Sequence, residues 1–126
     1  MTDFLSALID LAETTQPFAP ILRGPLLDGP SIAMEAAESD LTHHMDRNEA
    51  VRTAVVINAK HPDMTTAREA VMAIQRKLTR LTEYPTGEGW QIVDVWADDI
   101  PRLIGREDDN TWLYATALTA SIYYKE

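Results

Sequence analysis

Residues 111–124 read Thr-Trp-Leu-Tyr-Ala-Thr-Ala-Leu-Thr-Ala-Ser-Ile-Tyr-Tyr, the pattern of one uninterrupted β-strand with two different faces. Alternate side chains of a strand point to opposite sides of a sheet. The even positions are mostly large: Trp112, Tyr114, Thr116, Leu118, Ala120, Ile122 and Tyr124. The odd positions are smaller or only weakly polar: Leu113, Ala115, Ala117, Thr119, Ser121 and Tyr123. We therefore expect the even side to face a core and the odd side to be shielded from water by something else.

The length of this strand indicates what shields its odd-numbered side from water. At ~3.4 Å per residue it spans on the order of 45 Å, far longer than a typical strand. A chain of 126 residues forms a single domain that cannot cover both sides of such a strand alone. A neighbouring copy or another partner is the natural cover, and the predicted interface consists of Leu113, Ala115, Ala117, Thr119 and Ser121.

Composition favours a water-soluble protein and excludes several chemistries. Apolar residues make up 45% and charged residues 25%, and no run approaches the ~20 apolar residues of a membrane span. The beginning of the sequence lacks the pattern of a signal peptide, so we expect a cytoplasmic product without a membrane partner. The absence of cysteine excludes disulfides, thiol nucleophiles and cysteine-ligated zinc.

The net charge of −9 is distributed unevenly. Residues 1–50 hold nine acids and two bases, residues 51–82 two acids and six bases, and residues 83–126 nine acids and three bases. We predict that the basic Arg68, Arg76, Lys77 and Arg80 meet acidic flanks of neighbouring copies; the alternative is that these charges are simply solvated. An acidic chain is a poor ligand for duplex DNA, although an acidic surface could line a passage for DNA.

Periodicity predicts an α+β domain with a four-stranded, mostly antiparallel sheet and two helices packed on one face. Pro and Gly in 15–30 predict an irregular connector, and 38–49 predict a long loop. Thr66 and Glu69 form a predicted capping box for the second helix, whose apolar stripe runs from Ala67 to Leu81. The predicted elements are a helix over 3–14, an edge strand over 31–37, a strand over 50–60, a helix to about 81, a strand over 90–97, a loop over 98–110, and the final strand.

The predicted strand 90–97 carries apolar residues on both sides. Alternation places Trp90, Ile92 and Trp96 on one side, and Val93 and Val95 on the other. Trp90, Trp96 and Trp112 are expected in the core, rather than as stacking platforms for bases or sugars, because they stand at strand period beside aliphatic residues.

The sequence gives only weak indications of a catalytic or metal site. His43, His44 and Asp46 would serve a metal-dependent hydrolase, but adjacent histidines diverge, and solvated loop residues are the favoured interpretation. Asp98–Asp99 and Glu107–Asp109 match no EF-hand spacing, and no glycine pattern cradles a phosphate. We expect no catalysis and no cofactor.

The layout of the chain resembles that of tail terminator proteins of long-tailed bacteriophages, also described as minor capsid or minor tail proteins. The residues that carry the resemblance are Asp3–Leu5, Gly24–Leu26, Val55–Lys60, the helix to Leu81, Gly89–Val95, Pro101–Ile104, Glu107–Asn110 and Trp112–Tyr114. No single motif among them is a fingerprint.

The resemblance implies a ring, commonly a hexamer, at the head-proximal end of the tail tube. Such a ring stops polymerisation of the major tail tube protein, docks to a connector or neck protein, and lets DNA pass through its lumen without specific binding. The predicted loop 38–49 would project toward the lumen or the tube. Two alternatives remain open: a head-tail connector or head-completion protein, and a small non-catalytic binding or assembly module.

Overall fold

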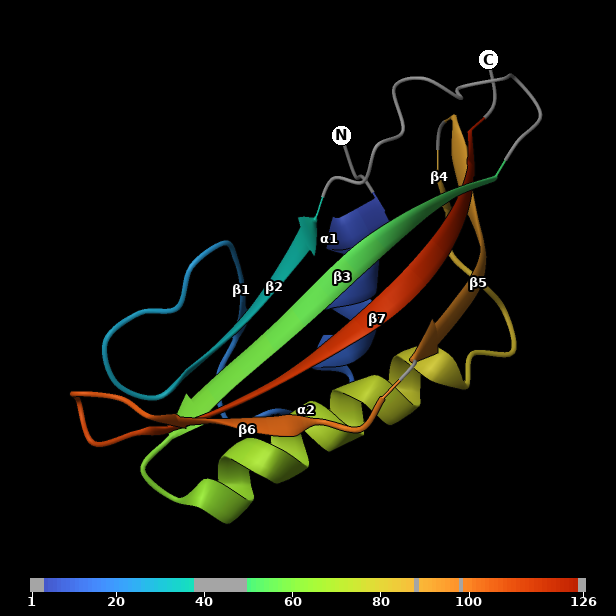
Figure 1. Ribbon diagram of the computed structural model, residues 1–126. Helices are drawn as coiled ribbons and strands as arrows, with labels where there is room; N and C mark the ends of the chain where they lie inside the picture. Colours follow the sequence, from blue (N-terminus) through green and yellow to red (C-terminus); the bar gives the residue numbers. More distant parts are fainter. Residues whose placement is uncertain (1–3, 38–49, 88, 98, 125–126) are drawn as a thin grey trace.

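Strand β7 (Trp112–Tyr124) is the strand on which the sheet is built (Figure 1). The computed structural model describes residues 4–37, 50–87, 89–97 and 99–124. On one edge β7 pairs antiparallel with β3 (Ala50–His61), from Trp112 to Tyr123. On its other edge it pairs first with β6 (Arg102–Arg106) and then with β5 (Trp90–Ala97).

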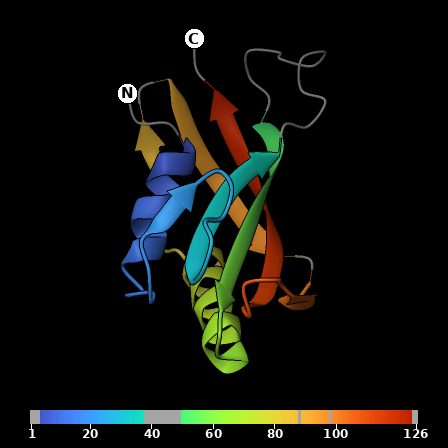
Figure 2. The same ribbon diagram turned by 90° about the vertical axis from the view of Figure 1, so that its left-hand side faces the viewer.

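Three further strands extend the sheet outward. β2 (Ser31–Ala37) runs antiparallel beside β3, and β1 (Ile21–Arg23) runs parallel to β2 at the edge. β4 (Thr86–Gly87) pairs with the start of β5. The order is β1-β2-β3-β7-β5-β4, with β6 paired to β7 off this path. Figures 1 and 2 show that the strands twist into a strongly curled sheet.

The predicted fold class is wrong. The structure is mostly β, with a seven-stranded mixed sheet that curls, and not a four-stranded antiparallel sheet with two helices on one face. β1 and β6 lie in the predicted connector 15–30 and the predicted loop 98–110, and β4 lies between the predicted second helix and the predicted strand 90–97. These strands are two to five residues long, and their backbone groups are satisfied by longer neighbours. A strand this short shows no alternation that a sequence can reveal.

The two helices of the described residues are α1 (Phe4–Glu13) and α2 (Met64–Thr79). Asp63 caps α2, because its side chain accepts hydrogen bonds from the Thr65 N–H at 3.0 Å and the Thr66 hydroxyl at 3.1 Å. The predicted capping box at Thr66 and Glu69 is therefore wrong, and the helix ends at Thr79, before Leu81.

The core joins both helices to the inward side of the sheet. The α2 stripe of Ala67, Val71, Ile74 and Leu78 is fully buried. It packs on β3 and β7 beside Leu8 of α1, and the strands contribute Val55, Ile57, Ile92, Leu118 and Ile122. Fully burying one such aliphatic side chain stabilises a fold by about 1.5–3 kcal/mol relative to leaving it exposed. The even positions of β7 from Tyr114 to Ile122 are buried, as predicted.

A β-bulge in β5 changes which side chains face the core. Ile92 pairs with Ile122 and Asp94 pairs with Ser121, so Val93 is an extra residue without a partner on β7. Beyond the bulge, Val95 is buried in the core, while Trp96 stands opposite Thr119 on the other side of the sheet. The predicted sidedness holds for Trp90 and Ile92 but is wrong for Trp96 and Val95, because the extra residue reverses the alternation.

Candidate assembly surface

The side of the sheet that faces away from the core is called the outer face here. It carries the even positions of β3 and the odd positions of β7, and their register sets Val56 beside Ala117 and Ala54 beside Thr119. Ala117 is exposed, and Leu113, Ala115 and Thr119 are half-buried, whereas Ser121 is buried. The structure thus places the five predicted interface residues on one face, most of which is accessible in a single chain.

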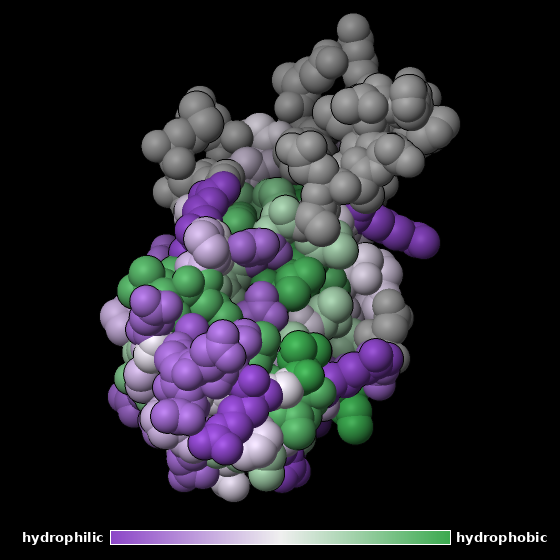
Figure 3. Space-filling model, turned by 60° about the vertical axis from the view of Figure 1, so that its left-hand side comes forward, coloured by the Kyte–Doolittle hydropathy of each residue, from purple (hydrophilic) through white to green (hydrophobic). Residues whose placement is uncertain are grey.

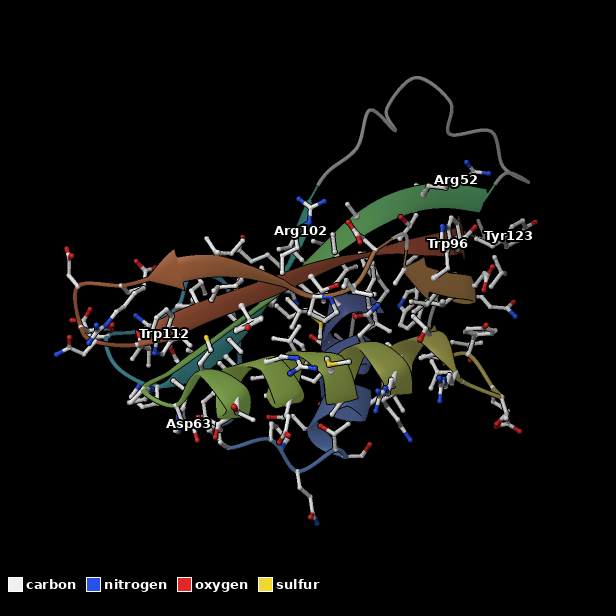
Figure 4. All side chains as sticks on the ribbon, turned by 60° about the horizontal axis from the view of Figure 1, so that its bottom comes forward. Arg52, Asp63, Trp96, Arg102, Trp112 and Tyr123 are labelled. Carbon is white, nitrogen blue, oxygen red and sulfur yellow. The ribbon has the colours of Figure 1, made fainter. Side chains whose placement is uncertain are left out.

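Two arginines lie over tryptophan rings, and of these two contacts only the one between Arg52 and Trp96 lies on the outer face. The guanidinium carbon of Arg52 lies 5.9 Å from the Trp96 ring centroid, and that of Arg106 lies 5.7 Å from the Trp112 ring centroid. Figure 4 shows Arg52 and Arg102 on the side of the sheet away from α2. Of the three tryptophans expected in the core, only Trp90 is buried.

A hollow of about 260 Å³ opens on the outer face. Its lining combines the strand pair with the β5–β6 connection: Val56, Asp99, Ile100, Arg102, Ile104, Ala115, Thr116 and Ala117. Ile100 is 72% exposed and Ile104 is 59% exposed. Large apolar side chains gathered in an accessible hollow are typical of binding surfaces. In the view of Figure 3, green apolar patches likewise lie between purple polar side chains.

An ion pair stands at the rim of the hollow. The Arg102 guanidinium lies 2.8 Å from Asp99 Oδ2, and this hydrogen bond, with a second from the Ile100 N–H, lowers the pKa of the Asp99 carboxyl. Both side chains are well exposed, so the pair adds little to stability.

Sequence reasoning missed this hollow because residues 98–110 were predicted to be a loop. The available signal was Ile100, Leu103 and Ile104, three large aliphatic residues within five positions of an otherwise polar segment. Exposing large aliphatic side chains is costly, and these three remain exposed on or beside β6, a short strand with both sides accessible.

The acidic turn Glu107–Asp109 is organised by Asp109, which binds groups of its own chain. Its carboxylate accepts hydrogen bonds from Lys60 Nζ at 2.8 Å, the Gly29 N–H at 2.8 Å and the Thr111 N–H at 3.3 Å, and a further one from the Thr111 hydroxyl. The bond from Lys60 is the main reason that the pKa of Asp109 lies far below its usual range. Asp109 thus joins the β6–β7 turn to β3 and to the β1–β2 loop.

The predicted basic residues occupy a different surface. Arg68, Arg76, Lys77 and Arg80 are exposed on α2 or at its end, and α2 packs on the inward side of the sheet. Within residues 4–37, 50–87, 89–97 and 99–124, none of the four pairs with a carboxylate. The two predicted groups therefore lie on opposite sides of the protein.

The metal hypothesis rested on His43, His44 and Asp46, which lie outside the described residues. Among the residues described, no group of three or more His, Cys, Asp or Glu is placed to hold a metal ion. The third histidine, His61, packs its ring edge-on against Phe18 at 4.8 Å, and its Nδ1 accepts a hydrogen bond from the Asp63 N–H. The described part of the chain has no helix that is both long and apolar enough to cross a membrane.

No family model and no curated protein matches this sequence. The fold, however, is shared with a chain of a solved structure described as the virion of a native gene transfer agent (GTA) particle. The two superimpose with a TM-score of 0.60 over 96% of this chain and 85% of that chain, at 16% sequence identity. A second solved structure, a crystal structure from Akkermansia muciniphila, gives a TM-score of 0.45 at 10% identity and covers 48% of that chain.

Proposed function

We propose that this chain is a non-enzymatic structural protein of a bacteriophage virion, and specifically a tail terminator. In this role it forms a ring, commonly a hexamer, at the head-proximal end of the tail tube. The observation that carries the proposal is the fold shared with a GTA virion chain over 96% of this sequence. The layout of the sequence, which resembles tail terminators, supports the finer assignment.

The outer face supplies a surface suited to assembly. Ala115, Ala117 and Thr119 have small side chains, and the backbone of another copy can approach them closely. The hollow beside them offers apolar area that association would remove from water. The proposed ring interface therefore comprises Leu113, Ala115, Ala117, Thr119 and Ser121.

Charge gives the second part of the interface. Arg68, Arg76, Lys77 and Arg80 are exposed on the side of the molecule remote from the outer face, without acidic partners among the residues described. We place them against acidic residues of the neighbouring copy. A contact that uses two different surfaces of each subunit is head-to-tail, the arrangement from which rings are built.

The remaining partners follow from the position of the ring. One rim meets the major tail tube protein, and the other meets a connector or neck protein. DNA passes through the lumen, and a subunit with a net charge of −9 repels the phosphate backbone and does not retain it.

Electron microscopy of particles assembled without this protein tests the assignment. A terminator is needed to stop polymerisation, so its loss should give tails longer than those of the complete particle. Tails of normal length lying apart from heads would instead identify a head-tail connector or head-completion protein. Complete, infectious particles would refute both structural roles.

A further inference from the structure

The hollow on the outer face has a counterpart on the same chain. Leu27, in the loop between β1 and β2, is 60% exposed. β1 and β2 lie on one side of the β3–β7 pair, and β6, which helps to line the hollow, lies on the other. The loop that carries Leu27 reaches the β6–β7 turn, where the Gly29 N–H donates to Asp109, but Leu27 is not among the residues that line the hollow.

The loop around Leu27 is held in place before any partner arrives. Pro25 and Pro30 restrict it, and Gly24 and Gly29 adopt positive φ angles of 117° and 77°. The Gly29 N–H donates to Asp109, and the Ser31 hydroxyl donates to the Leu27 carbonyl at 3.3 Å. A side chain presented by an ordered loop binds with a smaller loss of conformational entropy.

Charges beside the two features are complementary. Asp28 follows Leu27 directly and is exposed. Arg102 stands at the rim of the hollow with 72% of its side chain exposed, and its partner Asp99 is also largely exposed. An arginine has five N–H donors and can bind a second carboxylate while keeping the first.

We propose that Leu27 of one copy inserts into the hollow of the next copy, and that Asp28 of the first pairs with Arg102 of the second. The proposal rests on the ring of the proposed function and names the contact that closes it. In a ring this contact is head-to-tail: each copy inserts its Leu27 into one neighbour and receives the Leu27 of the other neighbour in its hollow.

Cysteine cross-linking tests this contact directly, since the natural sequence contains no cysteine. The double variant L27C/I104C, treated with a short bis-maleimide reagent, should give a ladder of covalent oligomers. An equimolar mixture of L27C and I104C should give only dimers. The matched control L27C/V93C, which moves the second cysteine to another exposed apolar position, should give none. A ladder from the control, or none from L27C/I104C, overturns the proposal.

A charge exchange provides an independent test of orientation. D28R and R102D should each weaken self-association by about 10-fold, and D28R/R102D should recover most of the loss. Each variant is first shown to be folded by circular dichroism, and both positions are exposed. A double variant as weak as the sum of the single ones overturns the pairing.

The cross-linking result can be separated from the proposed function. Wild-type oligomers in light scattering together with no L27C/I104C ladder would overturn the Leu27 contact but leave the ring intact. A wild-type chain that stays monomeric at about 1 mM, where association worth only ~4 kcal/mol would be visible, overturns this self-contact. The length of tails in particles that lack the protein then tests the proposed function independently of the Leu27 contact.

Discussion

Lys60 Nζ lies 2.8 Å from Asp109 Oδ2, and this pair ties the end of the central strand β3 to the turn between β6 and β7. The Lys60 side chain is only 9% exposed. The same carboxylate receives the Gly29 N–H, so three distant segments of the chain meet at Asp109. Removing one member of a largely buried pair leaves the other charge without compensation.

D109A should therefore lower the urea midpoint of unfolding at neutral pH, and D108A, at the exposed neighbouring position, should not. The pKa of Asp109 is depressed in the folded state, so its contribution is fully present above the unfolded-state pKa of about 4. As the pH falls below that value, the unfolded chain takes up the proton first and the contribution is lost. Urea titrations from pH 7 to pH 3 should show the difference between wild type and D109A shrinking below about pH 4. A constant difference across that range would contradict this role of the charge.

Thr116 places its hydroxyl in the core without a hydrogen-bond partner. Valine has nearly the same shape and carries no polar group there, so T116V should raise the free energy of unfolding by about 1 kcal/mol. Urea denaturation measures the change. T119V is the matched control on the outer face of the same strand, where no buried hydroxyl is removed, and it should have a smaller effect. A destabilised T116V would show that the hydroxyl is satisfied in solution.

Trp90 and Trp96 stand on the same strand, but the bulge at Val93 sends them to opposite sides. Trp90 is 7% exposed in the core, so W90A should cost about 3–5 kcal/mol of stability. Trp96 faces outward toward Arg52, and W96A should cost about 1 kcal/mol or less. Equal losses for the two variants in urea denaturation would contradict the register given by the bulge.

Ala117 is the exposed small residue at the centre of the proposed interface. A117E should give a folded chain that remains monomeric, because a bulky charge would be buried against the next copy. Light scattering measures the mass, and circular dichroism verifies the fold. T86E, an exposed substitution on the edge strand β4, should assemble like wild type. Assembly of A117E as complete as that of T86E would remove this face from the ring interface.

Long, regular elements were predictable from sequence because their periodicity is dictated by the core. The alternation of β7 and β3 and the apolar stripe of α2 are fixed by burial on the inward side. The bulge at Val93 was not predictable, because Val93 and Val95 are equally good strand residues, and only pairing with β7 decides which one is extra. The short strands β1, β4 and β6 were likewise not predictable, because pairing with a neighbouring strand stabilises them and their own sequences show no pattern.

For the outer face, alternation alone predicts that Leu113, Ala115, Ala117, Thr119 and Ser121 share one side of β7. Their role as an interface stays a prediction. The contribution of Ile100 and Ile104 depends on the chain continuing after β5 along the same edge of β7, which no local pattern encodes. Because acidic residues flank Ile100 and Ile104 in the sequence, the whole segment was predicted to be a loop.

β7 is hydrogen-bonded to β3, β5 and β6, yet it follows all of them along the chain. During synthesis, residues 50–61, 90–97 and 102–106 must wait for residues 112–124 before any of them gains its central neighbour. Before that point β3 can pair only with β2, and β5 only with β4, so each lacks the neighbour on its other edge. The complete sheet can therefore form only after residues 112–124 have been translated.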